Sequence, residues 1–262
     1  MILELQDIRI SFTNARREVF NLLNGINLQV PERQVTALVG GNGTGKTTLF
    51  NIISGFQRET GGTITFDGHR LNGLPAHRRA RLGMGRLFQG RQLMGDLTLL
   101  ENMKLADENP LGENPLSSIF LRKRVQREEA AREQEAISIL SRLFGSDSKY
   151  LQMLHHRAAD FSYGEQRMIA LACLLMGSNN KLLLLDEPTA GVNPIYCDTI
   201  ARIIRRMVEE EGLTVLLIEH NMHFVRSVSD TCAYLNEGRI EKVGPTAAVL
   251  DDPEVRNSYL GL

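Results

Sequence analysis

Residues 35–48 read Val-Thr-Ala-Leu-Val-Gly-Gly-Asn-Gly-Thr-Gly-Lys-Thr-Thr. A run of apolar and β-branched residues, 35–39, leads into a loop with four glycines that ends at Lys46 and Thr47. A buried strand followed by G-x-x-x-x-G-K-[ST] is typical of a phosphate-binding loop. The glycines let backbone N–H groups turn toward an anion. A helix expected over about 45–55 directs the positive end of its dipole at the same point.

Two residues of this loop carry specific chemistry. The Lys46 ammonium is suited to the β- and γ-phosphates of a nucleotide, and the Thr47 hydroxyl is suited to Mg²⁺. A glycine-rich turn with an exposed lysine is the simpler alternative, but the apolar run within 48–53 favours a buried helix directly after the loop. The residues expected to bind nucleotide here are Gly40, Asn42, Gly43, Thr44, Gly45, Lys46, Thr47 and Thr48.

The composition is that of an ordinary globular protein. The chain has 262 residues, of which 42% are hydrophobic and 23% charged, and its net charge is −1. This length predicts one large domain or two small ones, and the charge balance predicts no nucleic-acid partner. Three scattered cysteines without a C-x-x-C pair indicate a reducing, cytosolic compartment. No apolar run approaches the roughly 20 residues that cross a bilayer.

The order of apolar segments predicts an α/β fold. Short strands are expected over 3–12, 25–30, 61–68, 182–186, 213–219 and 230–236. In the second half, helices alternate with the strands, which favours a mostly parallel sheet covered by helices. The region 90–160 is helical, with a charged amphipathic helix over 122–144, and we expect it to be a subdomain inserted between two parts of that sheet.

A basic segment over 77–89 lies between these parts of the chain. Arg78, Arg79 and Arg81 are suited either to anionic lipid or to a partner protein, or to simple solvation. We expect solvation for all three. The arginines of 122–144 are offset by glutamates, so that segment is also expected to be a solvated face.

Two carboxylates follow the strand expected at 182–186. Four leucines lead directly to Asp186 and Glu187, and carboxylates at the end of a buried strand are costly unless they face a site. Asp186 is expected to hold the Mg²⁺ shell through water, and Glu187 is expected to polarise the water that attacks the γ-phosphate. A capping Asp beside a surface Glu is the alternative.

A second buried strand delivers polar residues to the same edge. The run 214–218 is followed by Glu219 and His220. A lone histidine after a strand is often a capping or packing residue, but the shared edge favours a role for His220 at the γ-phosphate and the attacking water.

Taken together, these motifs resemble those of ABC-type ATPase subunits over essentially the whole chain. The loop 40–47 resembles Walker A, Gln89 the Q-loop, 161–166 the signature motif, 182–187 Walker B, 190–194 the D-loop and His220 the switch histidine. The resemblance implies a P-loop NTPase core with a mostly parallel sheet, an N-terminal antiparallel β subdomain and an inserted helical subdomain. The expected division is 1–89 with 166–262 for the core and β subdomain, and 90–165 for the helical signature subdomain.

The resemblance also implies roles for individual residues. ATP and Mg²⁺ are the expected cofactors, with Glu187, His220 and Gln89 as catalytic residues. Thr47, Gln89 and Asp186 are the expected metal-binding residues. In the family, the signature residues bind ATP held by a second subunit, and they correspond here to Ser162, Gly164 and Glu165.

An aromatic residue is expected to stack on the adenine. Phe12 is the first choice and Phe20 the second, while a role for Phe12 as edge-strand core is about as well supported by the sequence. The Ser162 hydroxyl and the Gly164 backbone retain the donors of the common signature. Tyr163 and Glu165 depart from it, and the D-loop carries Asn193 where many members have Asp.

These departures are similar to those of one branch, the ATPases of branched-chain amino acid importers and their urea or amide relatives. The resemblance implies a cytoplasmic subunit, peripheral on the inner face of the cell membrane. Its expected partners are a second ATPase subunit, identical or not, transmembrane permease subunits and, indirectly, a solute-binding protein. The alternatives are a lipopolysaccharide-type exporter ATPase, a cluster-assembly ATPase, and a nucleotide-binding regulator without turnover, against which Glu187 and His220 argue.

Overall fold

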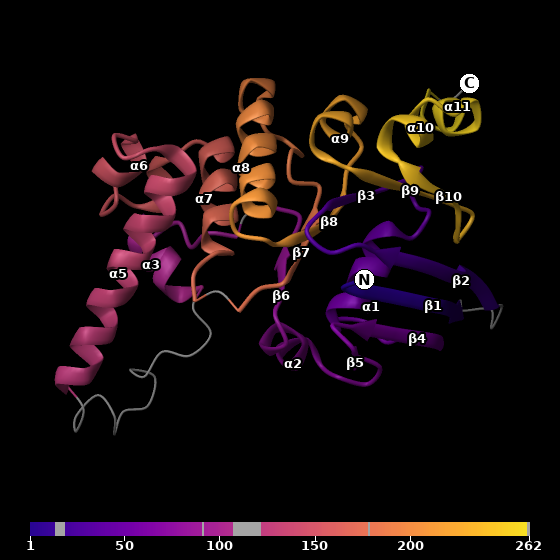
Figure 1. The fold of residues 1–262 in the computed structure, drawn as a ribbon, viewed down its shortest axis with the longest axis horizontal. Coiled ribbons are helices and arrows are strands. Elements are labelled where there is room, and N and C mark those ends of the chain that lie inside the picture. Colours follow the sequence, from indigo (N-terminus) through magenta and orange to yellow (C-terminus); the bar gives the residue numbers. More distant parts are fainter. Residues whose placement is uncertain (14–18, 91, 107–121, 178, 261–262) are drawn as a thin grey trace. The chain divides into compact units, whose positions relative to one another are not determined.

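The computed structural model describes residues 1–13, 19–90, 92–106, 122–177 and 179–260. They divide into two compact units (Figure 1). Unit 1 consists of Met1–Gln89, Asn180–Ala190 and Pro194–Leu262, and unit 2 of Gly90–Asn179 and Gly191–Asn193. Unit 1 contains both sheets, and unit 2 is helical in its described part.

The first sheet of unit 1 is antiparallel, as the sequence predicted. Its strand order is β2-β1-β4-β5. The strands are β1 (Leu3–Thr13), β2 (Val19–Val30), β4 (Gly61–Phe66) and β5 (His69–Arg70). Strand β2 begins earlier than the predicted residue 25, because its first half pairs with the end of β1, where Phe12 is the register partner of Phe20.

The second sheet is mostly parallel, which confirms the predicted α/β class. Its order is β10-β9-β3-β8-β7-β6, and only the β9–β10 pair is antiparallel. The strands are β3 (Val35–Val39), β6 (Met84–Leu87), β7 (Leu182–Asp186), β8 (Thr214–Ile218), β9 (Thr231–Asn236) and β10 (Arg239–Pro245). The sequence analysis missed β6, because Gly85 and Arg86 interrupt its apolar pattern.

The central strands are buried on both faces. Every residue of β3, β7 and β8 is buried, as expected for parallel strands covered by helices. Alternate residues such as Leu182 and Leu184 join one core cluster with the first sheet and α1 (Lys46–Ser54). Helix α8 (Cys197–Glu209) contacts β8 and buries its own apolar side. The remaining helices of unit 1 are α2 (Ala76–Arg81), α9 (Met222–Val228), α10 (Thr246–Leu250) and α11 (Pro253–Leu260), with a 3₁₀ turn η3 (Pro194–Tyr196).

Glycines fix both ends of α1. Gly45 and Gly55 have φ of 100° and 82°, a left-handed conformation that is costly for other residues. These glycines place the helix one residue inside each end of the predicted range 45–55. At the start of the loop, a Cβ on Gly40 would lie 2.2 Å from the Leu235 carbonyl oxygen, so this position has no room for a side chain.

Unit 2 is built from helices α3 (Leu99–Leu105), α5 (Arg122–Phe144), α6 (Lys149–Gln152) and α7 (Tyr163–Cys173), with a 3₁₀ turn η2 (Ala158–Asp160). Helix α5 covers the range predicted from the sequence. The predicted boundary at residue 165 is wrong, because α7 is one continuous helix that contacts α3 and α5. The helix therefore belongs as a whole to unit 2, which extends to Asn179.

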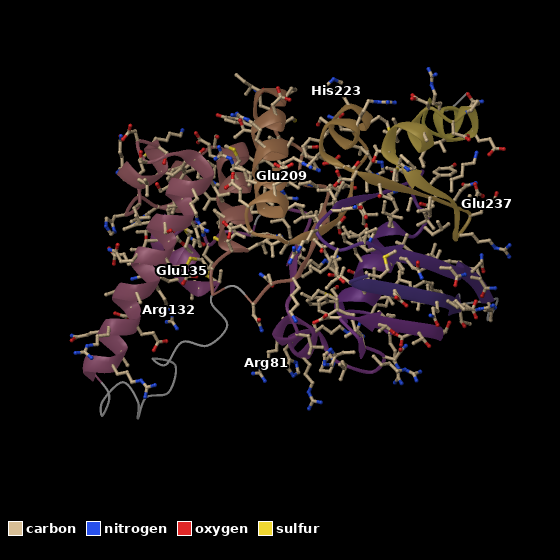
Figure 2. The ribbon with its side chains drawn as sticks, in the orientation of Figure 1. Arg81, Arg132, Glu135, Glu209, His223 and Glu237 are labelled. Carbon is tan, nitrogen blue, oxygen red and sulfur yellow. The ribbon has the colours of Figure 1, made fainter. Side chains whose placement is uncertain are left out.

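Charged side chains project from the surface of unit 1, among them the exposed Arg81, Glu209 and Glu237 (Figure 2). The expectation that Arg79 is solvated is wrong. Only 2% of Arg79 is exposed, and its guanidinium donates to the carbonyls of Ile52, Ile53 and Leu74 at 2.7–2.9 Å. It thereby caps the end of α1 with two donors to the carbonyls of Ile52 and Ile53. No helix of the described residues is long and apolar enough to cross a membrane.

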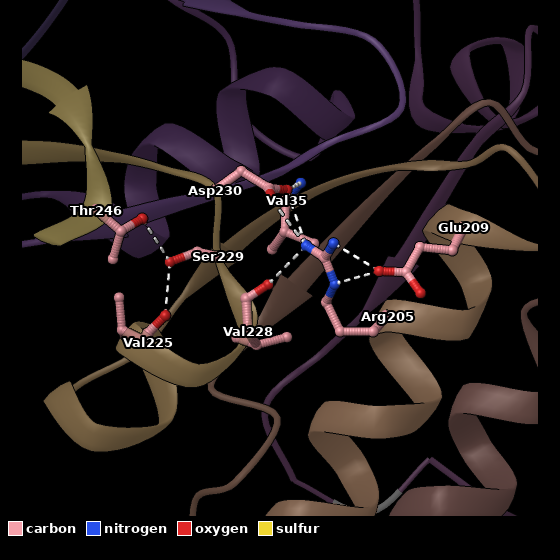
Figure 3. Close-up of polar contacts among 8 residues, drawn as sticks. All are labelled: Val35, Arg205, Glu209, Val225, Val228, Ser229, Asp230 and Thr246. Atoms are coloured by element: carbon pink, nitrogen blue, oxygen red, sulfur yellow. Dashed lines mark hydrogen bonds and ion pairs between the residues drawn. The ribbon is translucent and has the colours of Figure 1, made fainter.

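Arg205 and Asp230 join helix α8 to the start of β9 (Figure 3). Arg205 donates to both Asp230 oxygens at 2.9 and 3.0 Å and to Glu209 at 2.6 Å. Asp230 Oδ2 also accepts from the backbone N–H of Val35 at 2.8 Å. The same carboxylate therefore pairs with α8 and with the first residue of the strand that carries the phosphate-binding loop.

Replacing Asp230 with Ala should lower the free energy of unfolding by about 1–3 kcal/mol, because the Val35 N–H loses its partner. Urea unfolding followed by circular dichroism measures this change. The matched control is Arg226→Ala, which removes an exposed ion pair with Asp251 and should leave the urea midpoint nearly unchanged. Equal midpoints for the two variants would contradict the role given to Asp230.

Candidate functional site

Four neighbouring strands of the parallel sheet end at one edge. Leu38 of β3 lies level with Ile218 of β8, and Ile218 lies level with Asp186 of β7. On the other side of β7, Leu87 of β6 lies level with Leu185. The residues that follow these strands therefore meet at the carboxyl ends, where open α/β sheets bind ligands.

The loop after β3 surrounds the Lys46 ammonium. Lys46 Nζ donates to the carbonyls of Gly40 and Gly41 at 2.9 and 2.7 Å, and the residue is 6% exposed. Burial lowers the pKa of Lys46, while the nearby carboxylates of Glu187 and Asp186 act in the opposite direction. The loop thus holds a cation close to two carboxylates.

The three residues predicted to be catalytic lie together. Gln89 Nε2 donates to Glu187 Oε2 at 2.8 Å, and His220 Nε2 lies 3.2 Å from Glu187 Oε1. Glu187 itself has φ of 48°, a left-handed conformation that costs about 1–3 kcal/mol and that recurs at functional sites. Its backbone N–H donates to the Ile218 carbonyl at 3.0 Å, which holds the turn after β7 against the end of β8.

Asp186 is almost completely buried beside an arginine that the sequence analysis did not single out. Its side chain is 2% exposed, and Arg86 Nη2 lies 3.3 Å from Oδ2. Burial lowers the pKa of Arg86, and the charge of Asp186 opposes this effect. Arg86 stands three residues before Gln89, on strand β6. Its contact with Asp186 could not be predicted from the sequence, because the pairing of β6 with β7 was not predicted.

Glu219 is a second residue whose role the sequence did not reveal. It is 3% exposed and accepts from both the backbone N–H and the hydroxyl of Thr189, at 2.8 and 2.6 Å. Its other oxygen accepts from the backbone N–H groups of His220 and Asn221 at 3.0 and 3.3 Å. The buried carboxylate thus joins the segment after Glu187 to the segment that carries His220.

The cavity at this edge has a volume of about 250 Å³. Lys46, Glu187 and His220 line it together with Leu22, Asn42, Gly43, Gly45, Thr47 and Thr48. Gly40 and Thr44 belong to the same loop, where the Thr44 hydroxyl donates to the Gly41 carbonyl at 3.0 Å. Most of the predicted phosphate-binding residues therefore share one polar cavity with Glu187 and His220, while Gln89 reaches it through its hydrogen bond to Glu187.

Phe12 and Phe20 lie on paired positions of β1 and β2. Their rings stack with centroids 5.5 Å apart and planes 27° apart. Phe12 is half-buried against the core, while Phe20 is 53% exposed. Both candidates for stacking on an adenine therefore lie in one stacked pair.

The signature residues form the start of α7 in unit 2. The backbone N–H and hydroxyl of Ser162 both donate to Glu165 Oε2 at 2.8 Å, and Gly164 lies in the first turn of the helix. The other Glu165 oxygen pairs with Lys149. Glu165, which replaces the usual glutamine, therefore acts as a capping residue that holds Ser162.

Comparison with known proteins shows the family. The family model described as ABC transporter matches residues 23–190, which include the phosphate-binding loop, the signature and the carboxylates after β7. The chain belongs to the ABC transporter family.

Several curated relatives match over most of their length. The chain is 37% identical to the high-affinity branched-chain amino acid transport ATP-binding protein BraF of Pseudomonas aeruginosa, over 91% of both chains. It is 32% identical to LivG of Escherichia coli K12, which carries the same description, again over 91% of both. Among solved structures, it resembles the ADP conformation of MJ1267, an ATP-binding cassette of an ABC transporter, with a TM-score of 0.80 and 29% identity, covering 100% of this chain and 99% of that one.

Replacing Glu219 with Gln should lower the free energy of unfolding by about 1–3 kcal/mol, because an amide group cannot accept from all four donors around this buried position. Urea unfolding measures the loss. Glu241→Gln, an exchange of the same kind on the surface strand β10, is the matched control and should unfold like the native chain. If both variants unfold alike, Glu219 does not join the two segments as described.

Proposed function

We propose that this protein binds and hydrolyses ATP and that it powers transport through a membrane permease. The observation that carries the proposal is the Gln89–Glu187–His220 cluster, of which Glu187 and His220 line the cavity of the Lys46 loop. A carboxylate held by two polar side chains beside a phosphate-binding cation has the chemistry that phosphoryl transfer to water requires.

Each residue has a separate task in this proposal. The loop N–H groups and Lys46 bind the β- and γ-phosphates, and Phe12 or Phe20 stacks on the adenine. Glu187 accepts a hydrogen bond from the attacking water and orients it toward the γ-phosphorus. His220 and Gln89 hold the Glu187 carboxylate, and His220 is placed to donate to the γ-phosphate.

The oxygen donors at this edge suit Mg²⁺. Thr47, Gln89 and Asp186 offer a hydroxyl, an amide and a carboxylate oxygen, and Mg²⁺ prefers few protein ligands together with water and substrate phosphates. When bound, the ion neutralises charge on the β- and γ-phosphate oxygens.

The complete site is proposed to need two copies of the ATPase subunit. Ser162 and Gly164 begin a helix whose N-terminal N–H groups favour an anion. In the proposed dimer, identical or mixed, these donors and Glu165 meet ATP bound to the opposite subunit. Hydrolysis then reopens the dimer, and the permease converts the movement into transport.

The transported solute is proposed to be a branched-chain amino acid or a related amino acid, urea or amide. The support comes from the relatives described as branched-chain amino acid transport ATP-binding proteins, at 32–37% identity over about nine-tenths of the chain. We propose import, at the inner face of the cell membrane, with a solute-binding protein as the indirect partner.

Replacing Glu187 with Gln should reduce steady-state ATP hydrolysis at least 100-fold, because an amide orients water but accepts its proton poorly. The same variant should accumulate as an ATP-bound dimer. Phosphate release and light scattering measure the two effects.

Lys46→Ala is the control for this experiment, since it should bind nucleotide weakly and form no such dimer. Undiminished hydrolysis by Glu187→Gln would refute the proposed role of Glu187. Native nucleotide affinity in Lys46→Ala would refute the assignment of the phosphate-binding loop.

Replacing Ser162 with Ala should lower hydrolysis at least tenfold while the monomer still binds a fluorescent ATP analogue with native affinity. The reason is that Ser162 donates to ATP on the opposite subunit. Ser148→Ala removes the hydroxyl of another serine of unit 2, one that is buried, and is the control. Loss of nucleotide binding by the Ser162→Ala monomer would show that the site is not shared between subunits.

A further inference from the structure

Arg86 is a buried cation at the edge of the sheet, next to the proposed metal site. Its side chain is 6% exposed. Nη1 donates to the Ser54 hydroxyl at 2.6 Å, and Nη2 donates to Asp186 Oδ2 at 3.3 Å. Ser54 is the last residue of α1 and Asp186 the last of β7. One guanidinium therefore joins the end of the helix that follows the phosphate-binding loop to the end of the strand that carries the carboxylates.

Aromatic rings hold the guanidinium in this position. Its central carbon lies 4.5 Å from the ring centroid of Phe88, 5.7 Å from that of Phe56 and 5.9 Å from that of Phe50. Phe56 and Phe88 also contact each other edge to face, with centroids 5.1 Å apart. Cation–π contacts on several rings restrict where the guanidinium can move, so its direction toward Asp186 is set by packing as well as by charge.

The Ser54 contact adds a second restraint. The Ser54 hydroxyl accepts from Arg86 and donates to the Phe50 carbonyl at 2.6 Å, so its orientation is fixed by the helix. Because a guanidinium is planar and rigid, fixing Nη1 on Ser54 also fixes Nη2 opposite Asp186. A lysine at this position would keep the charge without this two-point geometry.

A buried carboxylate needs such a partner. Removing one member of a buried ion pair leaves an uncompensated charge, which strongly destabilises the arrangement around it. Asp186 then rotates toward another donor, and this rotation removes a carboxylate oxygen from its place at the end of β7. Metal binding depends on that place, because metal ligands are oriented by the groups that contact them.

We propose that Arg86 is a positioning residue for Asp186: it holds the carboxylate at the end of β7 in the orientation in which it joins the Mg²⁺ shell. This inference rests on the proposed function, since it takes Asp186 as a metal-binding residue. Arg86 itself binds neither nucleotide nor metal in this account.

The experiment compares nucleotide affinity with and without Mg²⁺. A fluorescent ATP analogue is titrated into the full chain in excess Mg²⁺ and in EDTA, and the ratio of the two affinities is the Mg²⁺ gain. In Arg86→Met, the Mg²⁺ gain should fall at least fivefold, while the affinity in EDTA changes by less than threefold. Arg86→Lys should recover at least half of the lost gain, because it retains the charge.

Arg79→Met is the matched control. Arg79 is also buried in unit 1, but its guanidinium donates to backbone carbonyls. This variant should be less stable than the native chain and yet keep the native Mg²⁺ gain. If Arg86→Met does not fold, Ser54→Ala replaces it, because this change removes one anchor of the guanidinium and should lower the gain at least twofold.

Asp186→Asn separates the inference from the proposed function. If Asp186→Asn loses the Mg²⁺ gain while folded Arg86→Met, or Ser54→Ala in its place, keeps it, the inference about Arg86 is overturned and the metal site stands. If Asp186→Asn itself keeps the native gain, the proposed metal role of Asp186 is refuted. A loss of gain in Arg79→Met equal to that in Arg86→Met would show that any buried arginine has this effect, which also overturns the inference.

Discussion

The fold and the site both depend on one constraint, the burial of parallel strands on both faces. Strands β3, β7 and β8 have no exposed residue, so polar side chains are tolerated only where the strands end. Neighbouring parallel strands end at the same edge of the sheet. This edge therefore brings together the loop that carries Lys46, the carboxylates of Asp186 and Glu187, and His220. The chemistry of this protein is thus a consequence of where its apolar strands stop.

Each charged residue at this edge contacts specific polar partners. Lys46 binds two loop carbonyls, Glu187 contacts Gln89 and His220, and Asp186 pairs with Arg86. Such networks are stable in a buried site only when their members are satisfied. A triphosphate that binds here as proposed exchanges existing hydrogen bonds, so its binding is expected to be linked to rearrangement of the proposed catalytic residues.

Membership of the ABC transporter family explains why the start of α7 in unit 2 is of functional interest. The helix α7 begins with a serine and a glycine whose donors suit a phosphate, and Glu165 with Lys149 supports that turn from within the same unit. A carboxylate in this position is compatible with anion binding because a lysine offsets its charge. The departure from the common signature is therefore accompanied by a compensating residue, which lies 16 positions away in the sequence.

The sequence by itself determined the α/β class, the phosphate-binding loop and the residues that follow the buried strands, because apolar runs and glycine spacing are local patterns. Tertiary structure alone decided the partners of those residues. Arg79 was expected to be solvated, but it is buried against the end of α1. Arg86 belongs to the basic segment 77–89, but it pairs with Asp186. Glu219 joins two segments that lie 30 positions apart in the sequence. Strand β6 and the extent of unit 2 were also hidden, since an edge strand and a helix boundary depend on neighbours that are distant in sequence. Burial of a charged group becomes favourable only when folding supplies its counterpart, and no local pattern contains that information.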